Sequence, residues 1–185
     1  GGHVVMPGFV DPHTHLIWAG DRAAEFEMRL EGKSYLEILA AGGGILSTVR
    51  QTRQASLETL LTEARPRLRE MLIHGTTTAE GKTGYGLQTE TELRMLQALL
   101  LLDAEGPLEI VPTFLGAHAV PPEFKDDPQG YTSDMCSEMI PSVRRWWDAH
   151  VPQRQLPFVD VFCETGAFSI EDSRRILETA RSSGF

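Results

Sequence analysis

The chain repeats one unit, a short β-prone run followed by a polar loop and an amphipathic helix, and this order constrains its fold most. Such runs at residues 4–10, 76–80, 108–115 and 158–163 predict four strands. Strands that alternate with helices pair in parallel, because each helix returns the chain to the same end of the sheet. We therefore expect an α/β fold built on a parallel sheet.

Glycines and a serine mark the helices of the first half. We expect helices over residues 23–30 and 35–41, the second of them ended by the triglycine at residues 42–44. Ser56 stands where a long amphipathic helix begins and is a plausible N-cap. Gly75 then ends that helix before the second predicted strand.

Three more helices are predicted in the second half. Thr89 and Glu92 have the spacing of a capping box, which opens a helix to about residue 103. Apolar residues at helical spacing predict another helix around Pro141. Ser169 is placed to cap the last helix, and Gly184 is placed as the C′ residue that ends it.

Side chains that carry chemistry gather at or just after the ends of the predicted strands. The carboxyl ends of parallel strands meet at one edge, where TIM barrels place their active sites. An open doubly wound sheet does the same, but no Gly-x-Gly-x-x-Gly follows the first strand, so a dinucleotide fold is the weaker hypothesis. Glu80 and Lys82 also share strand parity and are placed to pair. The residues at these ends are His13, His15, Glu80, Lys82, His118 and Glu164.

The tripeptide His13-Thr14-His15 follows the first apolar run. Alternate side chains of a strand point to one face, so the two imidazoles can project together. Two imidazoles are a common half-set for a bound zinc or iron ion, whereas catalytic zinc usually takes three protein ligands. The alternative is that both histidines are ordinary loop residues.

The composition excludes some classes of partner. With 17 Lys and Arg against 26 Asp and Glu, the net charge is −9, which argues against general nucleic-acid binding. No apolar stretch is long enough for a membrane span, and no signal pattern opens the chain. Cys136 and Cys163 stand far apart; a disulfide stays open, but we expect buried free thiols and a cytoplasmic location.

Four strands are half of the eight that close a TIM barrel, which typically takes about 250 residues. A half barrel leaves the edges of its sheet unpaired. We therefore expect this chain to be a segment of a longer protein. The exposed edges also favour association, as a homodimer.

Several segments resemble the amidohydrolase superfamily and, within it, the imidazolonepropionase family of histidine degradation. Residues 7–15 are similar to the first-strand segment that the superfamily's dihydroorotases, deacetylases and deaminases share. The narrower similarity comes from residues 42–49, 82–87, 116–123 and 173–175. The resemblance implies a TIM-like (β/α)8 metallo-dependent hydrolase barrel, of which residues 1–185 are the N-terminal part, roughly four βα units. It also implies that the remaining strands and a small β-domain are absent.

The resemblance implies roles for five residues. His13 and His15 are the expected ligands of one zinc or iron ion. Arg22, Tyr85 and His118 are expected to contact 4-imidazolone-5-propanoate, whose ring is opened by hydrolysis to N-formimidoyl-L-glutamate. His118 is also expected to be catalytic, by stabilising the oxyanion that develops during the attack of water. The third metal histidine, the catalytic acid and the metal-binding aspartate of the family are expected on later strands.

Simpler roles stay open for the same side chains. Arg22 is placed to form a surface pair with Glu25, three residues along a helix. Tyr85, between two glycines, is either a lid over a ligand or a surface loop residue, and His118 is either catalytic or bound to loop backbone. For the whole chain, the alternatives are another cyclic-amide hydrolase or deaminase, or a partial barrel that binds metal without turnover.

Overall fold

A computed structural model describes residues 2–34, 37–38 and 42–185 of the chain. Within these residues, four strands form one sheet in the order β1-β2-β3-β4, and each neighbouring pair is parallel. This is the expected α/β architecture, the arrangement of the first half of a TIM-like barrel. The strands are β1 (Phe9–Thr14), β2 (Thr76–Lys82), β3 (Glu109–Ala117) and β4 (Phe158–Val161).

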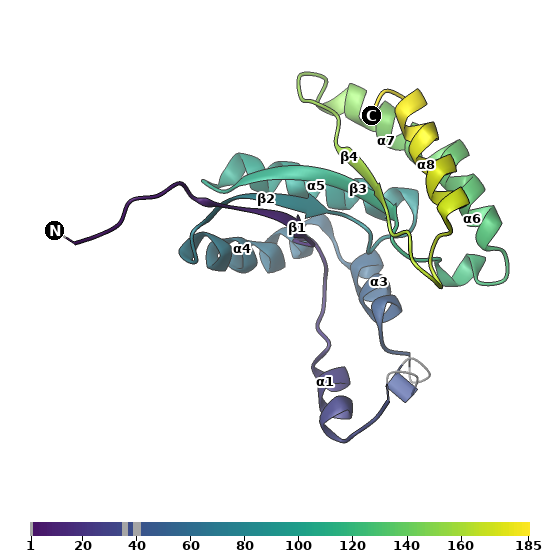
Figure 1. Cartoon of the computed structure of the whole chain (residues 1–185), viewed down its shortest axis with the longest axis horizontal. Helices are drawn as coiled ribbons and strands as arrows, with labels where there is room; N and C mark the ends of the chain where they lie inside the picture. The colour runs from purple at the N-terminus through teal and green to yellow at the C-terminus, as the bar shows by residue number, and fades with distance from the viewer. Residues whose placement is uncertain (1, 35–36, 39–41) are drawn as a thin grey trace.

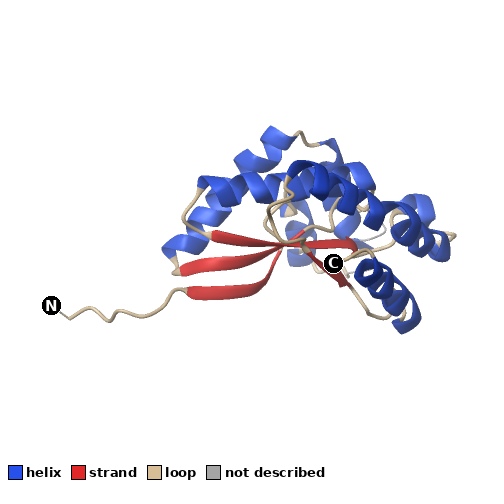
Figure 2. Ribbon diagram, turned by 90° about the horizontal axis from the view of Figure 1, so that it is seen from above, coloured by secondary structure: helices blue, strands red, loops and turns tan. Residues whose placement is uncertain are grey.

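Helices connect the strands and pack on the sheet. In Figure 1, α4 and α5 run along β1 to β3, while α7 and α8 lie beside β4. Figure 2 shows most of the helices gathered on one side of the curved strands. A 3₁₀ turn at Pro122–Phe124 and a π-helical turn at Met135–Met139 complete the described elements. The helices are α1 (Ala23–Leu30), α3 (Ile45–Gln54), α4 (Leu57–Ile73), α5 (Thr89–Glu105), α6 (Pro128–Asp134), α7 (Ile140–His150) and α8 (Ile170–Ser182).

The apolar core lies between the sheet and these helices. Leu60 of α4, Leu99 of α5 and Phe114 of β3 are each fully buried in it. Along β2 the side chains alternate, so that Ala79 faces the core while Glu80 faces away from it. The face of the sheet opposite the helices therefore carries polar side chains.

The capping signals read from the sequence are confirmed at two helices. The Ser56 hydroxyl accepts a hydrogen bond of 3.1 Å from the backbone N–H of Thr59, at the start of α4. At α8, Ser169 and Asp172 form a reciprocal capping box. Gly184, with a φ of +92°, follows the end of α8 as predicted.

The first strand begins later than the sequence predicts. Residues 4–10 were expected to form it, but β1 spans Phe9–Thr14, and Val4 and Val5 are 87% and 96% exposed. The reason is that the neighbouring strand β2 starts only at Thr76. The pairing of β1 with it begins where the Phe9 N–H donates a hydrogen bond to the Gly75 carbonyl oxygen. Apolar residues before Phe9 have no neighbouring strand. The third strand extends to Ala117 instead of residue 115, and the fourth stops at Val161 instead of residue 163.

Helix α3 is absent from the sequence prediction. Its buried face includes Thr48 and Thr52 beside Val49, so its apolar periodicity is weak. Gly44, with a φ of +77°, stands at the N-cap position, so the triglycine precedes a helix. Of the helix expected over residues 35–41, residues 35–36 and 39–41 lie outside the described part of the chain.

The described residues also test two inferences from composition. None of their helices is long and apolar enough to cross a membrane. Cys136 and Cys163 are both free, as expected, but Cys163 is exposed and Cys136 only partly buried. The expectation of two buried thiols is therefore wrong, because β4 ends before Cys163 and leaves it in a surface loop.

Candidate active site

Four predicted side chains meet at the carboxyl ends of β1, β2 and β3. The ring of His15 lies 4.7 Å from that of His118, stacked at 12°, and 5.0 Å from that of Tyr85, measured between centroids. Tyr85 and His118 are 5.3 Å apart, and His13 is 6.3 Å from His15. His13 belongs to β1 itself, and His15 is the first residue after it. His13, His15 and His118, which the strand-end pattern placed at one edge of the sheet, thus lie together although they are up to 105 positions apart.

His15 has the electrostatics of a metal ligand. Burial, followed by the nearby charges of His118, His13 and Lys82, lowers its pKa to about 4. The ring is therefore neutral at pH 7 and offers a nitrogen lone pair. Its Nδ1 atom is buried and has no hydrogen-bond partner.

An unpartnered nitrogen on a neutral imidazole, with a second imidazole beside it, fits a bound zinc or iron ion. Across the described residues, no third His, Cys, Asp or Glu joins His13 and His15 in a metal-binding group. The described residues therefore do not form a complete set of metal ligands around these two imidazoles.

His118 is held by loop backbone on one side. Its Nδ1 lies 2.9 Å from the carbonyl oxygen of Gly84. A carbonyl only accepts, so Nδ1 carries a proton and Nε2 is the remaining nitrogen. Burial is the main cause that lowers the pKa of this ring. The ring edge of Phe162 also approaches it, at 5.9 Å between centroids. The simpler role predicted for His118, a bond to loop backbone, is thus present and occupies only one nitrogen.

Arg22 and Tyr85 share a cavity with His15. The Arg22 Nε donates to the Thr48 hydroxyl at 3.1 Å and lies 4.0 Å from a Glu25 oxygen, so the predicted pair with Glu25 exists but is long. Burial raises the pKa of Tyr85, and the positive charge of Arg22 opposes that rise. The cavity measures about 420 Å³ and is lined by His15, Trp18, Asp21, Arg22, Thr48 and Tyr85.

Trp18 is a site residue that the sequence reasoning missed. The guanidinium of Arg67 stacks over its indole, 3.4 Å from the ring centroid. Arg67 also donates to the carbonyl oxygens of Leu16 and Trp18, at 3.1 and 3.0 Å. One arginine of α4 therefore fixes the loop that leads from His15 to Arg22. No sequence signal distinguishes Arg67 from a surface arginine on a helix.

Lys82 and Glu80 pair as their shared strand parity predicted. The Lys82 Nζ lies 2.9 Å from Glu80 and 2.7 Å from Asp160, a partner that the sequence did not reveal. Thr113 donates to the same Glu80 oxygen at 2.7 Å. Burial acts to lower the pKa of Lys82, but the bonds to Asp160 and Glu80 outweigh it and leave that pKa raised. Lys82 therefore joins β2, β3 and β4 as a charged ammonium.

Glu164, which follows the end of β4, is not among the four clustered side chains. It is exposed, and its carboxylate accepts the backbone N–H of Thr165 at 2.7 Å. The loop after β4 turns it away from the histidines.

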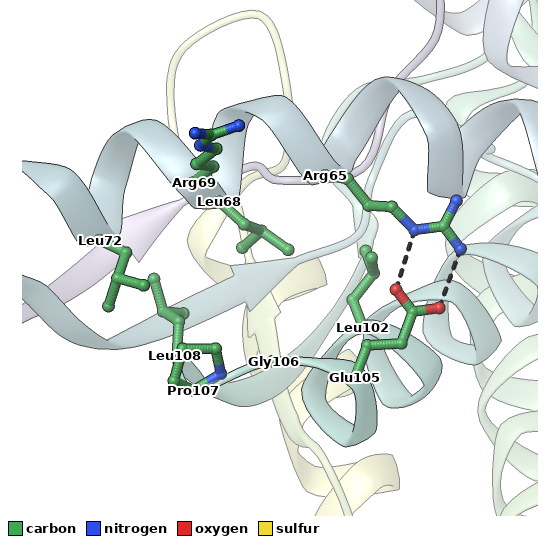
Figure 3. Close-up of a pocket in the computed structure, with 9 residues that line it drawn as sticks. All are labelled: Arg65, Leu68, Arg69, Leu72, Leu102, Glu105, Gly106, Pro107 and Leu108. Atoms are coloured by element: carbon green, nitrogen blue, oxygen red, sulfur yellow. Dashed lines mark hydrogen bonds and ion pairs between the residues drawn. The ribbon is translucent and has the colours of Figure 1, made fainter.

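A second cavity, shown in Figure 3, lies between α4 and the turn from α5 to β3. It measures about 250 Å³, and four of its nine lining residues are leucines. Arg65 and Glu105 close one side through hydrogen bonds of 2.8 and 2.9 Å. This cavity opens at the amino ends of the strands, and its charged pair is already satisfied. This cavity holds none of the predicted site residues.

Comparison with known proteins identifies the family of the chain. No protein-family model matches the chain. Proteins named imidazolonepropionase are 52% identical in Herpetosiphon aurantiacus, 55% in Chloroflexus aggregans and 52% in Haloarcula marismortui. These matches cover 100%, 99% and 99% of this chain, and 43%, 43% and 41% of the relatives, so the chain spans less than half of their length. The chain belongs to the imidazolonepropionase family.

Proposed function

We propose that this chain carries part of the active site of an enzyme that opens the ring of 4-imidazolone-5-propanoate to give N-formimidoyl-L-glutamate. The observation that carries the proposal is the convergence of His13, His15, Tyr85 and His118 at one sheet edge, beside the cavity that Arg22 lines. Relatives named imidazolonepropionase support the same reaction, a hydrolysis in histidine degradation.

His13 and His15 would hold one zinc or iron ion. The metal supplies a Lewis acid that makes water nucleophilic near neutral pH. Because catalytic zinc usually takes three protein ligands, the other ligands and the carboxylate that moves the proton are proposed to lie outside residues 1–185. The same proposal assigns these residues to the N-terminal part of the barrel domain, with the rest of the barrel and a small β-domain beyond them.

Arg22 is proposed to bind the propanoate group of the substrate. Its Nε is engaged by Thr48, which leaves the terminal nitrogens of the guanidinium for a carboxylate. Tyr85 faces the same cavity and is proposed to orient the imidazolone ring, so that the attack is nearly intramolecular.

His118 is proposed to contact the ring through Nε2, because Nδ1 is bound to Gly84. In the neutral imidazole, Nε2 accepts a hydrogen bond from a substrate N–H. Only the protonated ring donates to the oxyanion that develops on the substrate carbonyl, the catalytic role that the resemblance implies. In hydrolysis, the ring C–N bond breaks, the carbonyl carbon gains the water oxygen, and the nitrogen gains a proton.

Metal content and sedimentation test two of three finer proposals, the metal and the oligomeric state. We propose that the metal is zinc or iron and that the protein is cytoplasmic, with free thiols in accord with a reducing compartment. We also propose that this chain by itself forms a homodimer, because without the remaining strands Phe9 and Val10 on the edge strand β1 are 54% and 65% exposed. Sedimentation velocity is expected to give the dimer mass, and a monomer at all concentrations contradicts it.

The experiment that tests the proposed function is a chimera. The matching stretch of the Herpetosiphon aurantiacus relative is replaced by this chain, so that the relative supplies the rest of the protein. We expect ring opening, followed by ultraviolet absorbance, at a rate within about tenfold of the parent, since a tenfold change is only about 1.4 kcal/mol in the barrier. A folded, metal-loaded chimera without turnover favours the non-catalytic alternative. Faster turnover of another cyclic amide or of a deaminase substrate favours the other alternative, a different cyclic-amide hydrolase or a deaminase.

A further inference from the structure

The loop of residues 83–87 connects β2 to the site and has an unusual backbone. It carries Tyr85, and its Gly84 carbonyl accepts the hydrogen bond from His118. Gly84 has a φ of +106°, and Leu87 has a φ of +52°, which a branched side chain rarely adopts. Such a conformation persists only where surrounding groups hold it.

Glu92, in the first turn of α5, holds this loop through its N–H groups. Its side chain is completely buried, and one carboxylate oxygen accepts the N–H of Gly84 at 3.0 Å. The other oxygen accepts the N–H groups of Gly86 and Leu87, at 2.7 and 2.8 Å. Burial raises the pKa of Glu92, and the hydrogen bonds from Thr83, Leu87, Gly86 and Gly84 oppose that rise.

These contacts replace the capping box that the sequence predicted. Helix α5 begins at Thr89, and the N-cap position belongs to Gln88, whose side chain makes no capping bond. Glu92 turns to the loop and not back to the helix start. The predicted box is therefore wrong, because the loop offers three N–H groups that have no other partner at this position.

Arg53 of α3 holds the carbonyl groups of the same loop. Its Nε donates to the Gly86 oxygen at 2.7 Å, and its Nη2 donates to the Leu87 oxygen at 3.2 Å. Glu123 fixes that guanidinium through a 2.7 Å bond. The loop is thus bound from both sides, its N–H groups by Glu92 and its C=O groups by Arg53.

The loop also fits against His118 without spare room. A Cβ atom on Gly84 would lie 2.8 Å from the Leu115 oxygen and 2.9 Å from the His118 Nδ1. One on Gly86 would lie 2.8 Å from the Glu92 nitrogen. A displacement of the loop is therefore passed directly to the imidazole of His118.

We infer that Glu92 is a positioning residue of the active site. It fixes Tyr85 and His118 by binding the backbone of the loop of residues 83–87, which carries Tyr85 and contacts His118. It touches neither the cavity nor the proposed metal ligands. The inference rests on the proposed function for its catalytic consequence. The structural part, that one buried carboxylate sets the position of both rings, is independent of the reaction.

The first test is Glu92→Gln in this chain, studied by NMR. Whichever way the new amide is turned, its NH₂ group faces at least one loop N–H and removes that bond. Amide exchange at Gly84, or at Gly86 and Leu87, is expected to accelerate about 10- to 100-fold, as the loss of a charge-assisted bond predicts. The ¹⁵N signals of the His118 ring are expected to move as well.

The matched control is Glu90→Gln, in the same helical turn. The side chain of Glu90 is 81% exposed and pairs with Arg94, so neither the loop amides nor His118 should respond. Unchanged loop exchange and unchanged His118 signals in Glu92→Gln would overturn the inference.

Wild-type protein provides a second measurement, in case Glu92→Gln does not fold. The amides of Gly84, Gly86 and Leu87 must be protected from exchange, and each must show through-hydrogen-bond coupling to the carboxyl carbon of Glu92. Exchange at the rate of exposed amides overturns the inference without any variant.

Activity in the chimera links the loop to catalysis. Glu92→Gln is expected to lower kcat/KM about 10- to 100-fold at unchanged metal content, the size of effect that a misplaced catalytic group causes. If NMR shows the displaced loop but kcat/KM is unchanged, the positioning role is wrong. If the wild-type chimera opens no ring while the NMR results hold, the proposed function fails and the role of Glu92 in holding the loop stands.

Discussion

At the scale of single residues, the two stacked histidines of the site differ at Nδ1. The neutral His15 has a free Nδ1, whereas Nδ1 of His118 is bound to Gly84. Arg22 donates from Nε to Thr48 and also lines the cavity beside His15. His118 and Arg22 thus each have one nitrogen engaged by protein, whereas the buried Nδ1 of His15 has no hydrogen-bond partner.

Arg22→Met in the chimera tests the proposed carboxylate contact. We expect KM to rise about 10- to 100-fold, because two charge-assisted hydrogen bonds are lost. We expect kcat to change little, since binding of the propanoate is the same in the ground and transition states. The control is Arg29→Met, an exposed position on α1. An unchanged KM in the Arg22 variant would rule out this contact.

His13→Ala in the chimera tests the metal site. Loss of one ligand is expected to weaken metal binding by more than the roughly 10- to 100-fold that loss of an outer-shell partner costs. Metal content after dialysis, measured by mass spectrometry, gives the answer. His74→Ala, at a 79% exposed side chain, should keep its metal. Full occupancy in the His13 variant contradicts the ligand assignment.

At the scale of elements, features that depend on neighbouring residues could be predicted from the sequence. Contacts between residues far apart in the chain could not. His-x-His spacing and the glycines around Tyr85 are visible within a few residues, and so is the Ser169 cap. Asp160, by contrast, reaches Lys82 from 78 positions away, and Arg67 reaches Trp18 from 49. Glu92 is a different case. Its spacing from Thr89 is that of a capping box, so the sequence predicted a capping role and not the contacts with the loop.

Ser169→Ala tests the confirmed cap of α8. Removing the hydroxyl that accepts the Asp172 N–H should lower the free energy of unfolding by about 1 kcal/mol. Ser182→Ala, exposed at the other end of α8, is the control. Urea denaturation of both variants provides the measurement, and equal midpoints would show that the cap is unimportant.

The same cap predicts a dependence on pH. Hydrogen bonds from Ser169 lead the causes that hold the pKa of Asp172 below its ordinary value of 3.8. A depressed pKa in the folded state stabilises the protein above about pH 4, and that contribution disappears as the pH falls through the folded-state pKa. The stability difference between wild type and Ser169→Ala should therefore shrink below pH 4. A difference that grows in acid contradicts this.

At the scale of the whole molecule, the sheet is a half barrel, and ion pairs link its strands on the face opposite the helices. Lys82 joins Glu80 on its own strand to Asp160 on β4, and Thr113 of β3 binds the same Glu80. The strand order could be expected from the alternation of strands and helices, but this network could not. Its members are single polar residues in otherwise ordinary strands.

Lys82→Met tests that network. Loss of the ammonium leaves two carboxylates facing each other, and we expect about 2 kcal/mol of destabilisation, less than for a fully buried pair because Asp160 is half-exposed. Lys125→Met, at an exposed position, should have no measurable effect. Thermal unfolding compares the two, and equal stability would show that the strands do not depend on Lys82.

The most direct test of the active-site assignment is the position of bound product, determined by crystallography of the chimera with N-formimidoyl-L-glutamate. We predict one carboxylate of the product on the guanidinium of Arg22 and the rest of the molecule between Tyr85 and His118. Product bound in the cavity between α4 and α5, or anywhere away from these three residues, would contradict the account.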